Sequence, residues 1–270
     1  MITGRTRVYT ILARPSVHVT APMVYNHLFS RMGLDMVYIS HDIPPEAVDA
    51  TVASFASWEN LGGFNVTVPH KESVARLVNP ACPVAGAIGV VNTVVRRENG
   101  ALEGYNTDGE GALKALGDVA GARCLILGAG GAARAVAYAL AGAGASRISV
   151  MNRTPETARR LCSLVGHACV HVYDGEPLDG FDILVQATPV ADRVPFDLDL
   201  SRLRPGARVL ETVMRRTLLA QRVKDLGLEL VSGYAMLYHQ TPRNFELLTG
   251  IPLPERLLEE AFALVGFRLP

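Results

Sequence analysis

The sequence lacks the features that would indicate a membrane, secreted or nucleic-acid-binding protein. Its 270 residues carry 26 basic and 26 acidic side chains, so there is no excess positive charge to bind a nucleic acid or an anionic membrane. The longest apolar region, residues 124–151, contains Arg134, Arg147 and several glycines, which excludes a membrane span. Residues 1–10 contain no sustained apolar stretch of the kind found in secretory signals. We therefore expect a cytoplasmic protein without a nucleic-acid or membrane partner.

Disulfide and metal motifs are also absent. The four cysteines show no CxxC spacing: Cys82, Cys124, Cys162 and Cys169. We predict that they are buried free thiols. His167 and His171 have the spacing of a zinc pair on a helix, but no nearby glutamate motif or cysteine pair completes a site. Both are therefore expected to be surface histidines, and no metal is predicted.

The chain does contain a high proportion of apolar residues, 49% against 19% charged, which is typical of a protein with a large core. Its first part alternates between strand-like and helix-like runs. The predicted strands are residues 7–13, 36–43 and 63–68, and the predicted helices are one from Pro22 to the stop at Gly33 and one over 45–58. This alternation predicts a parallel βαβ arrangement. Residues 90–97 and 101–107 are predicted to form a hairpin, because Asn99-Gly100 lies between them.

The alternation then repeats in a second region. A helix carries Leu113 and Leu116, and strands are predicted at 123–127, 147–151, 181–186, 208–213 and 228–231. This pattern predicts a doubly wound, Rossmann-type nucleotide domain. Helices are expected over 240–248 and 255–264. The fold class is thus α/β, with a substrate domain over 1–107, a nucleotide domain over 108–234, and helices of 235–270 that pack back on the first domain.

A glycine-rich turn in the second region predicts a dinucleotide site. The turn directly follows a strand and opens an alanine-rich helix, and it comprises Gly128, Ala129, Gly130, Gly131, Ala132 and Ala133. Gly128 permits the tight turn, Gly130 allows the backbone to approach a pyrophosphate, and Ala133 fills the close-packed third position. The helix N-terminus then offers amide donors to the phosphates. A glycine-rich packing turn without a ligand is the alternative.

The next strand ends in Asn152, Arg153 and Thr154, and this ending bears on the type of cofactor. An NAD site usually has Asp or Glu here to accept from the ribose 2′-hydroxyl, and this chain has none. Arg153 instead suits a 2′-phosphate, through charge-assisted hydrogen bonds and stacking on the adenine. NADP is therefore the predicted cofactor, with NAD as the alternative.

Two polar side chains at the ends of strand-like runs are candidates for proton transfer. Lys71 ends the stretch that begins at Asn65, and Asp108 ends Gly104-Tyr105-Asn106-Thr107-Asp108. A lysine and a carboxylate beside a nicotinamide could relay a hydroxyl proton while hydride leaves the same carbon. A surface Lys-Asp salt bridge is the alternative interpretation.

Several blocks in order resemble the shikimate dehydrogenase family over nearly the whole chain. They are Asn65–Lys71, Gly89–Thr93, Gly104–Asp108, Asn152–Thr154 and Gly233–Gln240. The resemblance implies an oxidoreductase of aromatic amino acid biosynthesis, a monomer or homodimer, that transfers hydride reversibly between NADP and a ring hydroxyl of a shikimate-type cyclic polyol. It also implies roles for particular residues: Lys71 and Asp108 as the catalytic pair, Thr67, Asn92 and Gln240 as contacts to ring hydroxyls, and Thr188, Val213 and Gly233 as further cofactor contacts.

The chain departs from the family where the substrate carboxylate is bound. The family's His-Ser-x-Ser-Pro block reads His18-Val19-Thr20-Ala21-Pro22, so Val19 and Ala21 replace both serines. Thr20, in an extended segment, is expected to face the opposite side. The tyrosine of the family's Val-Tyr-x-Pro block is also missing after Val213, and Gln186 replaces the asparagine of the Asn-Ala-Thr block.

These departures leave the substrate open. Each lost hydrogen bond to a charged group is worth about 1.5–3 kcal/mol, so shikimate should bind weakly unless Arg14, Arg215 or Arg216 takes over the carboxylate. Alternative substrates are quinate, an aminated analogue or an uncharged ring alcohol. A ligand-binding protein without turnover is a further alternative, and the intact Lys71 and Asp108 argue against it.

Overall fold

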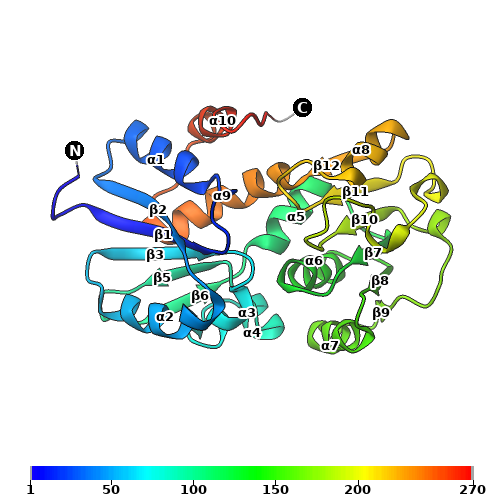
Figure 1. Cartoon of the computed structure of the whole chain (residues 1–270), viewed down its shortest axis with the longest axis horizontal. Helices are drawn as coiled ribbons and strands as arrows, with labels where there is room; N and C mark the ends of the chain where they lie inside the picture. The colour runs from blue at the N-terminus through cyan, green and yellow to red at the C-terminus, as the bar shows by residue number, and fades with distance from the viewer. Residues whose placement is uncertain (1, 269–270) are drawn as a thin grey trace. The chain divides into compact units, whose positions relative to one another are not determined.

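The computed structural model describes residues 2–268 (Figure 1), which form two compact α/β units. Unit 1 comprises Met1–Thr107 with Gln240–Pro270, and unit 2 comprises Asp108–His239. The division between the two falls inside helix α9 (Gly233–Thr249), which begins seven residues before the predicted helix start at 240. Within the described residues, no helix is both long and apolar enough to cross a bilayer.

Unit 1 is built on a six-stranded sheet in the order β2-β1-β3-β5-β6-β4. The predicted parallel arrangement is confirmed, because β1 (Arg7–Ala13) lies parallel between β2 (Met36–Asp42) and β3 (Leu61–Val66). The predicted hairpin is also confirmed: β5 (Thr93–Arg96) and β6 (Leu102–Tyr105) are antiparallel, and Gly100 in their turn has a φ of +83°. Strand β3 ends two residues earlier than predicted, and the two-residue strand β4 (Asn79–Pro80) is too short to produce a sequence signal.

Different sets of side chains cover the two faces of this sheet. Helix α2 (Val48–Ser57) contributes Phe55 to an apolar cluster with Leu12 and Phe64. Tyr25 and Phe29 of α1 (Ala21–Arg31) instead pack with Phe245 of α9. The remaining helical elements of the unit are η1 (Pro45–Ala47), α3 (Lys71–Ala75), α4 (Pro83–Ile88) and α10 (Glu255–Ala263).

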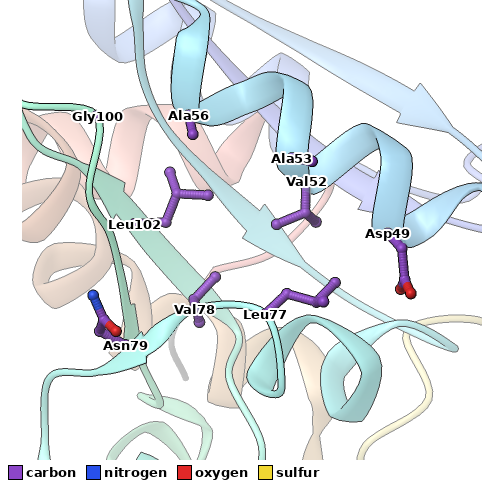
Figure 2. A pocket seen from close by; sticks show the side chains of 9 residues that line it. All are labelled: Asp49, Val52, Ala53, Ala56, Leu77, Val78, Asn79, Gly100 and Leu102. Carbon is purple, nitrogen blue, oxygen red and sulfur yellow. The ribbon is translucent and has the colours of Figure 1, made fainter.

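A cavity of about 240 Å³ lies in unit 1 beside α2 (Figure 2). It is lined mainly by small and apolar side chains, among them Val52, Ala56, Val78 and Leu102. None of the residues predicted to bind substrate or cofactor lines it, so it is separate from the candidate site.

Unit 2 has the predicted doubly wound topology. Its six strands are all parallel, in the order β12-β11-β10-β7-β8-β9. The strands are β7 (Arg123–Leu127), β8 (Arg147–Met151), β9 (Val170–Val172), β10 (Ile183–Gln186), β11 (Arg208–Glu211) and β12 (Glu229–Ser232). The helical elements are α5 (Asp108–Leu116), α6 (Gly131–Gly142), α7 (Pro155–Val165), η2 (Leu178–Gly180), η3 (Pro195–Asp197), η4 (Leu200–Arg202) and α8 (Leu218–Asp225). Strand β9 was not predicted; it has three residues, and its central His171 is exposed.

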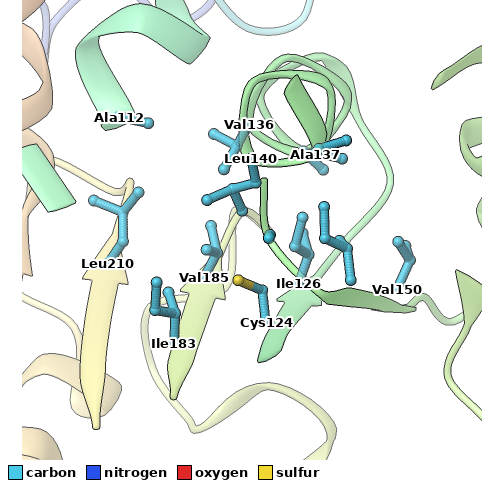
Figure 3. Close-up of a cluster of buried hydrophobic side chains, with 14 of the residues drawn as sticks. Ala112, Cys124, Ile126, Val136, Ala137, Leu140, Val150, Ile183, Val185 and Leu210 are labelled. Carbon is cyan, nitrogen blue, oxygen red and sulfur yellow. The ribbon is translucent and has the colours of Figure 1, made fainter. Parts of the chain in front are cut away.

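The core of unit 2 explains why its strands are continuous apolar runs. Figure 3 shows α6 lying over Ile126, Val150 and Val185, all inaccessible to solvent. A parallel sheet with both faces covered requires apolar side chains on both. Cys124 is fully buried in this core, and its burial raises the pKa of the thiol to about 12.

The four cysteines are free, as predicted, but only Cys124 is fully buried; the other three are half-buried. The prediction of four buried thiols is therefore wrong for Cys82, Cys162 and Cys169. Cys162 lies on α7 and Cys169 in the turn before β9. Both pack against the core of unit 2 on one side only. His167 and His171 are surface residues, as predicted.

The contact between α5 and α6 yields a test of the packing in unit 2. A methyl group on Gly109 would lie 2.6 Å from the carbonyl oxygen of Ala135 and 2.8 Å from the Cβ of Ala139. Alanine normally stabilises a helix by about 1 kcal/mol relative to glycine. Here we expect Gly109→Ala to lower the free energy of unfolding by about 1–3 kcal/mol, because α5 and α6 must move apart to accept the methyl group.

Gly142→Ala is the matched control, because a methyl group at the end of α6 meets nothing within 4 Å. It should be neutral or stabilising. Denaturant unfolding of both variants provides the measurement, and equal free energies of unfolding would contradict the close packing of α5 on α6.

Candidate functional site

The glycine-rich turn has the conformation that phosphate binding requires. Gly128 follows β7 with a φ of +106°, and a Cβ there would lie 2.9 Å from the carbonyl oxygen of Ala187. Gly130 is the extended residue before α6, and a Cβ on it would meet nothing within 4 Å, so the space beside its backbone is open. Ala133 is fully buried, as its packing role requires. These residues fit a pyrophosphate at the N-terminus of α6.

The end of β8 carries an exposed cation. Asn152 Nδ2 donates to the carbonyl oxygen of Thr154 at 2.9 Å, which shapes the turn before α7 and places Arg153 within it. Arg153 is exposed, and no ion pair involves it within the described residues. Arg159, the nearby alternative, already pairs with Glu156 at 2.7 Å. Arg153 thus remains the predicted contact for a ribose phosphate.

Two buried side chains hold the loops after β10 and β11. Gln186 and Glu211 are neighbours in the register of these strands, and both are almost inaccessible to solvent. The Oε1 of Gln186 accepts from the backbone and hydroxyl of Thr188, both at 3.0 Å. Glu211 accepts from the amide of Val213 at 2.9 Å and from the hydroxyl of Thr217 at 2.7 Å. The predicted cofactor contacts Thr188 and Val213 are therefore fixed by their own strand ends.

Gly233 is needed at the start of α9 for a steric reason. A Cβ there would lie 2.8 Å from the carbonyl oxygen of Thr212 and 3.0 Å from that of Glu211. The backbone of α9 thus approaches the end of β11 more closely than any side chain would allow. The positioning role of Glu211 was missed from the sequence, because one acidic residue after an apolar strand has no distinctive spacing.

The predicted hydroxyl contacts lie in unit 1. The amide of Thr67 donates to the carbonyl oxygen of Leu12 at 2.9 Å, which places Thr67 beside the end of β1. Lys71 is the first residue of α3, and its carbonyl oxygen accepts from the amide of Val91 at 3.3 Å. The backbone of Lys71 therefore lies beside the residue that precedes Asn92.

Asn92 and Gln240 are brought together by hydrogen bonds. Asn92 Nδ2 donates to Thr107 Oγ1 at 2.8 Å and to Gln240 Oε1 at 3.3 Å. The Oδ1 of Asn92 accepts from the amide of Thr107 at 3.0 Å. Asp108, which is buried, follows Thr107 directly and begins α5. Of the predicted substrate contacts, Asn92 and Gln240 are thus in direct contact.

The block that replaces the two serines contains no accessible hydroxyl. Val19 and Ala21 are half-buried, and Ala21 rather than the predicted Pro22 is the first residue of α1. The expectation that Thr20 lies in an extended segment is wrong: its φ of −93° and ψ of −11° are helical, because α1 begins at the next residue. Its Oγ1 is buried without a hydrogen-bond partner. Thr20 therefore presents no donor to solvent.

Arg14 and Ser16, in the same loop, both contact Asp42. Asp42 accepts from the amide of Ser16 at 2.7 Å and pairs with Arg14 at 3.5 Å. These contacts hold the pKa of the Asp42 carboxyl below its usual value, with the backbone hydrogen bond from Ser16 as the largest cause. Arg14 thus has an anionic partner within its own unit. In unit 2, Arg215 donates to the carbonyl oxygen of Pro189 at 3.2 Å.

Exposed apolar side chains surround the altered block. Val17 is 79% exposed and Met23 is 54% exposed. Val68, 62% exposed, lies beside the same loop, because its carbonyl oxygen accepts from the amide of Arg14 at 3.2 Å. Three exposed apolar side chains thus lie near Val19 and Ala21, together with the exposed Arg14 and His18 of the same loop.

Comparisons with known proteins agree on one family. The model of the shikimate dehydrogenase substrate-binding domain matches residues 11–94, and that of shikimate/quinate 5-dehydrogenase matches residues 110–194. A shikimate dehydrogenase (NADP(+)) of Geobacter sp. strain M21 is 38% identical, over 97% of this chain and 96% of its own. The chain belongs to the shikimate dehydrogenase family, and it is an oxidoreductase with a Rossmann-type nucleotide domain.

Solved structures of similar proteins have the same fold. Shikimate 5-dehydrogenase of Thermus thermophilus, in complex with NADP(H) and shikimate, is 32% identical with a TM-score of 0.83, over 96% of this chain and 99% of its own. The ligand-free 5-ketofructose reductase of Gluconobacter sp. strain CHM43 is 29% identical with a TM-score of 0.77, over 97% and 100%. Proteins with this architecture thus include one named for a substrate other than shikimate.

The buried Glu211 predicts a pH-dependent stability. Burial raises the pKa of its carboxyl from 4.5 to about 6, against the opposing hydrogen bonds from Thr217 and Val213. Between these two pH values the folded protein holds a proton that the unfolded chain has lost, so its stability falls as pH rises from 4.5 to 6. The total loss is about 2 kcal/mol and extends about one pH unit beyond each of these two values.

Glu211→Gln should remove this dependence of stability on pH. The free energy of unfolding of the unmodified protein minus that of the variant should therefore decrease by about 1.3 kcal/mol between pH 4.5 and 6, and by about 2 kcal/mol over the wider range from about pH 3 to about pH 7.5. Glu110→Gln, at an exposed position of α5, serves as the control. Denaturant unfolding at several pH values gives the comparison, and parallel curves for the protein and the Glu211 variant would contradict the assignment.

Proposed function

We propose that this protein is an NADP-dependent dehydrogenase that transfers hydride reversibly between the cofactor and a ring hydroxyl of a shikimate-type cyclic polyol. The observation that carries the proposal is the hydrogen-bonded cluster of Asn92, Thr107 and Gln240, of which Thr107 directly precedes Asp108 in the chain. The names of the curated relatives support NADP as cofactor and shikimate-type substrates. Residues 1–107 with 235–270 would form the substrate domain, and 108–234 the nucleotide domain.

The proposed chemistry divides proton and hydride between side chains and cofactor. NADP supplies the hydride acceptor, held by the 128–132 turn and by Asn152, Arg153 and Thr154. Lys71 would take the proton of the reacting hydroxyl, with Asp108 as its charged partner. Desolvation lowers the pKa of a lysine, while a neighbouring carboxylate raises it, so the two effects together set the range in which a lysine can exchange a proton.

Ring hydroxyls would be bound by Thr67, Asn92 and Gln240. Each can donate or accept a hydrogen bond, which suits a hydroxyl better than a carboxylate. The buried position of Asn92 and its contacts to Thr107 keep its amide from rotating. A fixed amide favours one orientation of the ring over the nicotinamide.

A second candidate substrate is an uncharged ring alcohol. The block at Val19 and Ala21 provides no accessible hydroxyl, and the buried Oγ1 of Thr20 does not replace one. A carboxylate placed there would lose its hydration without compensation. The likeness to a 5-ketofructose reductase is compatible with an uncharged substrate. Quinate and an aminated analogue retain a carboxylate or a charge and are less well suited to this surface.

The role of Lys71 predicts a loss of turnover. Lys71→Ala should lower kcat by roughly 10²–10⁴-fold, the usual contribution of a positioned acid-base group, and should leave the affinity for NADP nearly unchanged. Lys224→Ala, on the exposed end of α8, is the control and should behave like the unmodified protein. Steady-state kinetics and calorimetry measure the two quantities. Near-normal turnover of the Lys71 variant would remove this residue from the mechanism.

The role of Arg153 predicts cofactor preference. NADP should bind more tightly than NAD, because the guanidinium can pair with the 2′-phosphate. Arg153→Ala should lower the ratio of the dissociation constant for NAD to that for NADP at least tenfold, since a charge-assisted hydrogen bond contributes about 1.5–3 kcal/mol. Arg159→Ala is the matched control, because Arg159 already pairs with Glu156. Calorimetry that shows a preference for NAD in the unmodified protein would reverse the assignment.

The altered block predicts a gain of shikimate activity on restoration. Val19→Ser together with Ala21→Ser should increase kcat/KM for shikimate by one to two powers of ten, since two hydrogen bonds to the carboxylate become available. The same double variant should change kcat/KM for an uncharged ring alcohol much less. Equal changes for both substrates would show that these positions do not contact the carboxylate.

A further inference from the structure

A buried polar network connects the sheet of unit 1 to helix α9. Its members come from four strands or strand ends and from α9, and all are at most 7% exposed. They are Tyr38, Asn65, Asn92, Thr93, Thr107 and Asn244, hereafter the polar network. Asn92 belongs to the proposed substrate site. Asn244 lies one helical turn after Gln240 and has no role in the proposed chemistry.

The directions of the hydrogen bonds in this network follow from the single proton of each hydroxyl. Thr93 Oγ1 accepts from Asn65 Nδ2 at 2.9 Å, and the nearest acceptor for its own proton is Asn244 Oδ1 at 2.8 Å. Thr107 Oγ1 accepts from Asn92 Nδ2 at 2.8 Å, and its nearest acceptor is again Asn244 Oδ1, at 2.7 Å. The carbonyl oxygen of Asn244 therefore receives both hydroxyl protons.

This arrangement also involves the two neighbouring amides, Asn92 and Gln240. Thr107 directs its proton to Asn244 and accepts from Asn92 Nδ2, while the backbone amide of Thr107 separately donates to Asn92 Oδ1. The same Nδ2 group donates to Gln240 Oε1 at 3.3 Å. With Oε1 facing the network, Gln240 presents its Nε2 donor to a substrate hydroxyl.

We propose that Asn244 is a positioning residue that sets the hydrogen bonding of Asn92 and Gln240, because it accepts the hydroxyl protons of Thr93 and Thr107 that would otherwise go to their carbonyl oxygens. The inference rests on the proposed function, because it assigns those two amides to ring hydroxyls. Loss of the acceptor on Asn244 leaves two buried hydroxyl protons without their nearest partner. Thr93 can then turn its proton to Asn92 Oδ1, 3.2 Å away, and Thr107 can turn its proton to Gln240 Oε1, 3.4 Å away, so the hydrogen bonding of both amides changes.

The test compares two substitutions of similar size. Asn244→Leu removes the acceptor and Asn244→Asp keeps an oxygen in its place. Asn244→Leu should raise the KM for a ring alcohol on the order of tenfold, the effect of losing one to two neutral hydrogen bonds. Asn244→Asp should stay within about threefold of the unmodified protein, as expected when the acceptor is retained. The dissociation constant for NADP should not change in either variant.

Tyr38→Phe is the control for a purely structural effect. It removes the donor to Asn65 Oδ1 at the far end of the polar network and leaves both bonds to Asn244 in place. It should lower the melting temperature without changing the KM. If Asn244→Leu does not fold, Asn244→Ala replaces it in the comparison, because alanine is smaller than asparagine and fits the site. Equal KM values in the leucine (or alanine) and aspartate variants would overturn the proposal.

A second measurement does not depend on turnover. In the unmodified protein, the side-chain amide protons of Asn92 should exchange slowly with solvent by NMR, and the exchange should become faster in Asn244→Leu but not in Asn244→Asp. If no ring alcohol supports NADP reduction by the unmodified protein, the proposed function fails, and the exchange rates still decide the role of Asn244. Unchanged exchange in Asn244→Leu would overturn the role even in an active enzyme.

Discussion

The candidate site depends on the pairing of Asn92 with Thr107. Asn92 directly precedes β5 and Thr107 lies two residues after the end of β6, so the antiparallel hairpin brings them within hydrogen-bond distance. The amide of Asn92 also donates to the carbonyl oxygen of Tyr105 at 3.0 Å, which continues the hairpin by one residue. Breaking this pairing would release Gln240 on one side and change the backbone that leads into Asp108 on the other. A buried amide without partners is costly, so the pairing is strongly favoured.

Unit 2 also has buried polar side chains that hold the chain at the end of its sheet. Gln186 and Glu211 are buried polar side chains at the carboxyl ends of neighbouring strands, and each folds back on the loop that follows it. The amide of Leu218 then donates to the carbonyl oxygen of Ala191 at 2.8 Å, which connects the two loops. In both units, a buried polar side chain at or next to the end of a strand holds the segment that carries predicted ligand contacts.

The sequence was sufficient for the parts of the fold that have strong periodic signals. The strands at 7–13 and 123–127 are mainly apolar and are buried beyond their first one or two residues, and Gly100 has the conformational freedom that a hairpin turn requires. Strands β4 and β9 were missed because two or three residues give no pattern. Lys71, Asp108 and the other predicted ligand contacts remain predictions, since their roles come from a resemblance.

Other features depend on tertiary contacts that no local pattern encodes. The pairing of Arg14 with Asp42 arises because β1 and β2 are neighbours in register, and the sequence could not place Arg14. The helical backbone at Thr20 follows from the exact start of α1, and helix boundaries are uncertain by one or two residues from sequence. Asn244 did have a signal, since it lies four residues after Gln240 and so on the same helix face.

The central claim is that this protein keeps the contacts to ring hydroxyls and has lost those to the carboxylate. The most direct measurement is the steady-state kinetics of the unmodified protein with NADP, using shikimate and the same ring without its carboxylate. The account predicts turnover of both, with a much higher KM for shikimate and a kcat/KM that favours the uncharged ring. A micromolar KM for shikimate, together with a lower kcat/KM for the uncharged ring, would contradict it.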